Sequence, residues 1–291
     1  MSKRILLTAF LLLSFSNIVL AEGWEKAADL NLSMNQSAYG DSWAGGEYGA
    51  LNWTFNANFD AAKSLSDIFR SENNLKLSYG QTHNQYEDAD GKLAWAAPKK
   101  SADRIFLESL MRMTLGKLAD PYVAFTFESQ FLDSSDPFAR SLMLNPMLLS
   151  ESLGLSRAFI EVDNQKLFSR VGFAMRQNMV KTFMDDTSET TESMTSNDGG
   201  IEWVTDYERS FSENLKIVSK LRAFKALYFS ESVEGDDDWQ ATDLAWETTV
   251  SASLAKYLQV SFFFELLYDK QIALSGRYRE TLGLGLSYKL F

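Results

Sequence analysis

Alternating apolar and polar residues recur in long runs along the chain. The cleanest run covers residues 48–59, where Leu51, Trp53 and Phe55 alternate with Asn52 and Thr54. Side chains of a β-strand point to its two faces in turn, so each run predicts a strand with one apolar and one polar face. Several runs last about ten residues, which suits a membrane-crossing strand better than a soluble one.

No apolar run beyond residue 21 approaches the roughly 18–20 residues of a transmembrane helix. The chain is therefore either soluble or crosses a membrane as a closed barrel, because a bilayer requires every backbone polar group to be paired. We predict twelve strands, and an even number suits an antiparallel barrel. They cover residues 28–35, 48–59, 73–82, 104–115, 122–131, 152–162, 167–179, 200–207, 215–229, 243–254, 257–268 and 277–291.

The connections favour the same fold class, an all-β, closed antiparallel transmembrane β-barrel of about 12 strands. Connections on one side are mostly short and are predicted to be periplasmic turns, with residues 60–72 as an exception. Those on the other side are mostly long, polar and predicted to be extracellular, such as residues 83–103 and 180–197. The alternative is a soluble barrel or sandwich with the apolar face inside. Long strands, an Asn-, Ser- and Gly-rich polar face and aromatics near strand ends favour the membrane.

The N-terminus has the pattern of an export signal. Lys3 and Arg4 precede an apolar stretch at residues 5–20, and small residues end it at Ala21. We predict a cleaved signal peptide at residues 1–21 and a barrel domain at residues 22–291, located in the bacterial outer membrane. The absence of cysteine excludes disulfides, and the net charge of −11 argues against nucleic acid as a partner.

Residues 277–291 close the series of strands. Their apolar row continues through Leu286 and Tyr288 to Leu290, but the final Phe291 falls one residue out of phase. The phase predicts either an early end of the strand or a bulge. Tyr288 and Phe291 are the candidate assembly signal for the barrel assembly machinery.

Three segments carry a resemblance to a known family. They are the opening Gly23-Trp24, the segment at residues 35–46 with its Trp-Ala-Gly-Gly turn, and the ending Gly-Leu-Gly-Leu-Ser-Tyr-Lys at residues 283–289. The chain resembles an uncharacterised family of Gram-negative outer-membrane β-barrels, known as domain of unknown function 3078. The resemblance implies the fold and the location, and no established activity.

Charged residues on the polar strand faces are the main functional candidates. A buried charge must be paired or hydrated, so these residues either fill a narrow barrel with a structural network or line a polar path that sets selectivity. We predict a narrow or gated passive pore for small polar solutes or ions, or alternatively a non-conducting structural or surface-interaction barrel. The candidates are Arg104, Glu108, Arg112, Glu128, Arg170, Arg176, Glu202, Asp206, Lys220, Arg222, Glu247 and Glu265.

Other candidates rest on single residues or loops. His83 is the only histidine, and with nearby Ser and Asn or Asp residues it would give an outer-membrane lipid hydrolase, a minor alternative function. A lone loop histidine is more often a solvated side chain, so we predict no enzyme and no cofactor or metal centre. Acidic clusters at residues 87–90, 185–192 and 231–238 are either solvated or bind divalent cations that bridge lipopolysaccharide. The apolar loop at residues 132–151 enters the barrel mouth, lies at the outer leaflet or lengthens its flanking strands.

Overall fold

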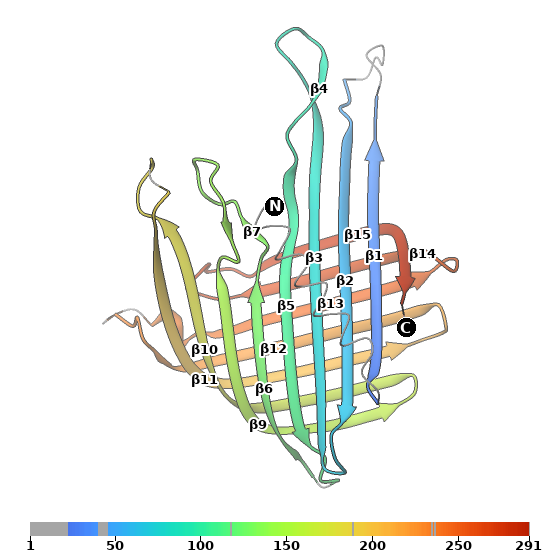
Figure 1. Cartoon of the computed structure of the whole chain (residues 1–291), viewed down its shortest axis with the longest axis vertical. Coiled ribbons are helices and arrows are strands. Elements are labelled where there is room, and N and C mark those ends of the chain that lie inside the picture. Colours follow the sequence, from blue (N-terminus) through green and yellow to red (C-terminus); the bar gives the residue numbers. More distant parts are fainter. Residues whose placement is uncertain are drawn as a thin grey trace.

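The computed structural model describes residues 23–39, 46–116, 118–187, 189–233, 235 and 237–290. Within these ranges twelve long strands form the wall of one barrel (Figure 1). The signal peptide predicted at residues 1–21 and the terminal Phe291 lie outside the described residues. The wall strands are β1 (Glu25–Ser37), β2 (Ala50–Ser64), β3 (Phe69–Glu87), β5 (Lys99–Met113), β6 (Asp120–Ser129), β9 (Met147–Val162), β10 (Gln165–Phe183), β11 (Thr191–Ser210), β12 (Leu215–Phe229), β13 (Thr242–Ser253), β14 (Leu258–Tyr268) and β15 (Arg277–Lys289).

Each wall strand pairs with its neighbours in chain order, always antiparallel, and β15 returns to pair with β1. This ring confirms the predicted fold, and each predicted strand overlaps one wall strand of the described chain. Outside the wall are a short β4 (Leu93–Trp95) on β3, a β7–β8 hairpin (Leu132–Asp133 and Leu142–Met143) and a 3-10 turn η1 (Asp238–Gln240). In the described ranges, no helix is long and apolar enough to cross a membrane.

Two predicted connections are much shorter in the structure. β2 ends at Ser64 and β3 begins at Phe69, so the exceptional connection predicted at residues 60–72 is a short turn like the other periplasmic ones. β10 runs to Phe183 and β11 begins at Thr191, so much of the loop predicted at residues 180–197 is strand. Neither stretch has a continuous apolar face, and the alternation therefore could not reveal these strand ends.

The barrel is apolar outside and charged inside. Leu153 faces outward with 62% of its surface exposed, whereas inward-facing Arg170 keeps 2%. A soluble fold would reverse these environments, so the alternative of a soluble barrel or sandwich is wrong. An apolar exterior on a closed, fully paired wall is what a bilayer requires, and it is the architecture of bacterial outer-membrane barrels. The chain is therefore an outer-membrane barrel.

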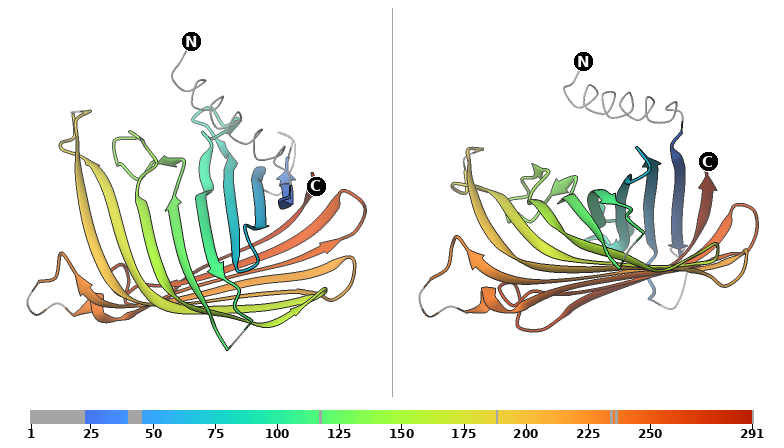
Figure 2. Two further views of the ribbon diagram at one scale, coloured as in Figure 1. Left: turned by 60° about the horizontal axis from the view of Figure 1, so that its bottom comes forward. Right: turned by 90° about the horizontal axis from the view of Figure 1, so that it is seen from below.

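The seam between the first and last strands is short. In the described residues, five residue pairs join Asp29–Ser33 of β1 to Gly285–Lys289 of β15, whereas thirteen pairs join β1 to β2. Near the C-terminus β1 and β15 lie side by side, and further along they diverge (Figure 2). β15 ends at Lys289, close to the early end that the phase of the last residues predicted, and Leu290 N donates to Ala28 O at 2.9 Å.

Candidate functional site: the charged lumen and its outer vestibule

Charges on β5 meet charges from the opposite side of the barrel. Arg104 and Glu108 share the inward face of β5, as the alternation predicted. β5 and β13 are diametrically opposed, because five wall strands separate them in either direction around the ring. Arg104 Nη2 nonetheless donates to Glu247 Oε1 of β13 at 3.0 Å. This ion pair therefore bridges the full width of the lumen.

Glu108 forms a second bridge, to β12 and β10. Its Oε1 lies 2.6 Å from Nζ of Lys220, and its Oε2 lies 2.5 Å from Nη2 of Arg170. All three side chains are buried. A buried carboxylate is stabilised only by close partners that replace its lost hydration, and Glu108 uses both oxygens in this way. The two bridges start from positions four residues apart on β5, so they lie one above the other in the lumen.

All twelve predicted lumen residues have an ion partner within the part of the chain that the structure describes. Arg104 also lies 3.1 Å from Glu128 and 3.7 Å from Glu265. This geometry matches the interpretation of the charges as a network that fills the barrel. The remaining pairs are Arg222 with Glu128 and Glu202, Lys220 with Asp206, Arg112 with Glu72, Arg176 with Asp198 and Asp243, Lys76 with Glu247, and Arg279 with Glu265.

Phe106 is a central residue of the lumen that the sequence reading missed. It is fully buried on the inward face of β5, between Arg104 and Glu108. The charged groups of Arg104, Arg222, Lys220 and Lys76 lie 5.0, 5.5, 5.6 and 5.7 Å from the centre of its ring. The negative face of an aromatic ring attracts cations at such distances. Its position in the alternation would have placed Phe106 inside, but its apolar side chain matched the outward set.

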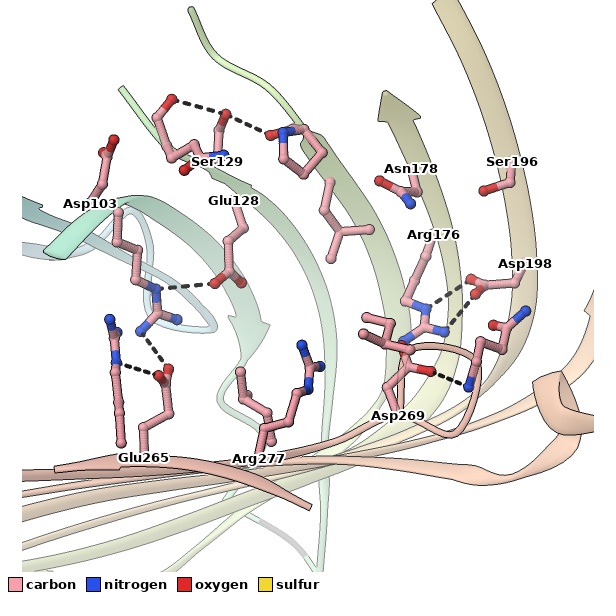
Figure 3. A pocket seen from close by; sticks show the side chains of 18 of the residues that line it. Asp103, Glu128, Ser129, Arg176, Asn178, Ser196, Asp198, Glu265, Asp269 and Arg277 are labelled. Carbon is pink, nitrogen blue, oxygen red and sulfur yellow. Dashed lines mark hydrogen bonds and ion pairs between the residues drawn. The ribbon is translucent and has the colours of Figure 1, made fainter. Parts of the chain in front are cut away.

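A cavity of about 780 Å³ lies in the extracellular half of the barrel, above the bridges. Strands β5, β6, β9, β10, β11, β12, β14 and β15 contribute to its wall, and Arg104, Glu128 and Glu265 lie at its inner end. We call this cavity the vestibule. Figure 3 shows Asn178 and Ser196 on one side of it and Arg277 pointing into it from β15.

Most charges of the vestibule are already neutralised by a neighbour. Arg176 donates to both carboxylate oxygens of Asp198, at 2.8 and 2.5 Å (Figure 3). Arg279 lies 2.7 Å from Glu265. In the described part of the chain, Arg277 has neither an ion-pair partner nor a hydrogen bond from its side chain. Its guanidinium is therefore the basic group in the vestibule that is available to a ligand.

The apolar loop at residues 132–151 both lengthens a strand and lines the mouth. β9 begins at Met147, and Pro146 and Leu148 line the vestibule. The Asn145 side chain fastens the loop to β10, because it accepts from Lys181 N at 2.7 Å and donates to Lys181 O at 3.0 Å. The loop is thus a fixed part of the outer rim.

The same loop contains a local ion pair outside the membrane-spanning part. Arg140 Nη2 lies 2.8 Å from Asp136 Oδ1, and this hydrogen bond holds the pKa of Asp136 below its ordinary value. The Arg140 guanidinium also lies 3.9 Å from the ring centre of Phe183 at the end of β10. These contacts stabilise the tip of the hairpin.

The other candidates from the sequence, such as His83 and Tyr288, are not part of this site. His83 lies near the outer end of β3, opposite Leu51 of β2, and the catalytic hypothesis stays a prediction. In the ranges that the structure covers, no group of three or more His, Cys, Asp or Glu side chains is placed to hold a metal ion. Tyr288 faces outward and stacks on Tyr257 with ring centres 6.0 Å apart, while Phe291 lies outside the described residues.

Residues 34–134 match a family described as a protein of unknown function, DUF3078. This segment runs from within β1 to just beyond β7, and it supports the resemblance over these residues. A comparison with curated proteins found no match.

Several solved structures have a similar course of the chain. An outer-membrane channel from Pseudomonas putida F1 is 11% identical, with 93% of this chain and 96% of that chain covered, at a TM-score of 0.41. The translocator domain of the autotransporter NalP from Neisseria meningitidis is 11% identical, with 98% and 95% covered, at 0.40. The NanC porin is 9% identical, with 91% and 100% covered, at 0.35. At TM-scores and identities this low, the likeness carries no argument about activity.

Proposed function

We propose that the protein is a gated outer-membrane pore for small polar solutes or ions, closed at rest by the two bridges across its lumen. The observation that carries this proposal is the contact between Arg104 and Glu247 on diametrically opposed strands. A path opens only when such pairs separate and water hydrates their charges. The polar lining then offers opposite charges to a passing solute, which is how barrel lumens set selectivity.

Planar-bilayer conductance of a balanced double variant tests this proposal. Arg104→Ala with Glu247→Ala removes one bridge, while Glu265 keeps Arg279 at 2.7 Å and Glu128 keeps Arg222 at 4.0 Å. Lys76 loses its 3.5 Å contact with Glu247, but its side chain is 30% exposed to water. We expect rare, brief openings of the wild type and sustained conductance of the double variant. The matched control is Lys216→Ala with Glu208→Ala, which removes an exposed pair between adjacent strands and leaves conductance at the wild-type level.

A second function is favoured by the complete pairing of the predicted lumen charges. A barrel in which these twelve lumen charges neutralise one another is suited to a non-conducting structural or surface-interaction role. Absence of conductance in both the wild type and the Arg104/Glu247 double variant would support this role and contradict the gated pore.

The partners follow from either function. We propose contacts with outer-membrane lipid and lipopolysaccharide along the apolar exterior, and delivery by the barrel assembly machinery with Tyr288 as part of the signal. Divalent cations at the acidic outer loops remain part of this proposal.

A further inference from the structure

The outer halves of β1 and β15 are not paired with each other. β15 pairs with β14 as far as Arg277, but its last partner on β1 is Ser33, opposite Gly285. Likewise, β1 pairs with β2 as far as Ser37, but not with β15 beyond Ser33. Figure 1 shows the cause, because β15 runs across the barrel while β1 continues along it. The wall therefore has a lateral opening between Met34–Ser37 and residues 277–282, beyond Gly283, where an added Cβ would still lie 3.0 Å from Cβ of Ser33.

An open strand edge cannot face acyl chains. Unpaired backbone N–H and C=O groups cost several kcal/mol each in hydrocarbon, and lipid-exposed sheet edges do not occur there. The two edges must therefore meet water or a polar group that reaches them. Two outward side chains at the opening agree with this, because Gln36 on β1 and Glu280 on β15 are polar. Nearer the periplasmic end, the same outward faces carry Leu32 and Leu284.

The opening joins two different environments. On the outside, Tyr278, Leu282 and Leu284 of β15 expose 72%, 74% and 51% of their surface toward the membrane. On the inside, Arg277 and Arg279 of the same strand line the vestibule. Arg279 is neutralised by Glu265, so Arg277 carries the available positive charge. A molecule that bridges both sides needs an apolar chain outside and an anionic head inside.

We propose that this opening is a lateral binding site for an anionic amphiphile of the outer leaflet. Its acyl chain lies along the apolar face of β15, and its anionic head enters the vestibule and binds Arg277. The head also supplies acceptors for the free edges of β1 and β15. This site does not depend on conductance, so a non-conducting barrel leaves the proposal intact.

Cysteine pairs test the opening itself, and the natural chain has no cysteine to interfere. In the seam, Leu30 lies opposite Tyr288; if the same register continued, Gln36 would lie opposite Leu282. Cross-strand neighbours lie within disulfide distance. We expect Leu30→Cys with Tyr288→Cys to cross-link at least about tenfold faster under oxidation than Gln36→Cys with Leu282→Cys. Equal rates would show a closed seam and overturn the proposal.

Binding of a monoacyl probe tests the ligand. The protein in phosphatidylcholine nanodiscs is titrated with fluorescent lysophosphatidic acid, with empty nanodiscs as background. We expect saturable binding that weakens about tenfold in Arg277→Gln, a loss of about 1.4 kcal/mol. The control is Arg157→Gln, which removes an exposed cation on β9 beside Phe159, and it leaves the affinity unchanged.

Two further probes separate the sources of the anion. Lysophosphatidylcholine has the chain without the net negative charge, and glycerol phosphate has the anionic head without the chain. We expect both to bind at least about tenfold more weakly than lysophosphatidic acid. Equal binding of lysophosphatidylcholine, or no effect of Arg277→Gln, would overturn recognition of the head. Equal binding of glycerol phosphate would overturn lateral entry and indicate a soluble anion from the outer mouth.

Discussion

Glu108→Gln tests whether the lumen is closed to water at its middle. The change keeps the shape of the side chain and removes the charge that holds Arg170 and Lys220. Breaking a buried ion pair on one side costs about 3–5 kcal/mol, because the other charge stays buried without compensation. Lys220 keeps Asp206 at 3.3 Å, whereas the Arg170 side chain is 1% exposed and its described ion pair is with Glu108. Only one of the two cations, Arg170, is thus left without its ion partner. We therefore expect a cost at the lower end of this range, about 3 kcal/mol.

The measurement is urea unfolding of the barrel in lipid vesicles, followed by the heat-modifiable mobility of the folded form on gels. Lys220→Met should cost less, about 1.5 kcal/mol, because Glu108 keeps Arg170 as a charged hydrogen-bond partner. The control Glu208→Gln removes the partner of the exposed Lys216 and should cost below about 1 kcal/mol.

The result that contradicts the closed lumen is a cost for Glu108→Gln no larger than that of Glu208→Gln. Water would then reach Arg170 and screen its charge. A triple variant with Glu108→Leu, Arg170→Met and Lys220→Met separates charge from packing. Replacing a buried ionic group by apolar residues of similar volume is often neutral or stabilising, so we expect stability within about 2 kcal/mol of the wild type.

Three further predictions concern the lipid face, the inner wall and the outer loop. Phe173→Arg places a charge on the lipid face of β10 and should cost about 2–4 kcal/mol in the same unfolding assay, while Met184→Arg, just beyond the strand, should cost below about 1 kcal/mol. Gly172→Ala should destabilise by about 1–3 kcal/mol, because an added Cβ would lie 2.2 Å from a backbone oxygen of the neighbouring strand. Because the pKa of Asp136 is lowered, its pairing with Arg140 is present above the ordinary pKa of aspartate and is lost as the pH falls through the depressed value. Cleavage of this loop by an acid-active protease, divided by its cleavage of an unstructured peptide at the same pH, should therefore stay constant from about pH 6 to 5 and rise below about pH 4.

The strands were predictable because membrane walls impose alternation. A residue of the wall faces either lipid or lumen, so the period of two is strict wherever the barrel crosses the apolar layer. Residues 215–229 were predicted with the bounds that β12 has in the structure. The prediction failed where the constraint stops, as in the turn after Ser64, because both faces of a strand are hydrated beyond the bilayer. The same rule assigned Arg104, Glu108 and Arg170 to the polar faces of their strands, and these side chains are inward-facing in the structure.

Alternation assigns each residue to a face, but it carries no information on height or on distance across the barrel. Arg104 and Glu247 are 143 residues apart, and their contact depends on the tilt and stagger of all the strands between them. Phe106 was missed because residue type was weighed above position, although an inward aromatic among cations is stabilised by their charge. The alternation also gives no sign of the opening between β1 and β15. Both strands alternate well beyond Ser33 and Gly285, and only their divergence in space leaves the outer halves apart.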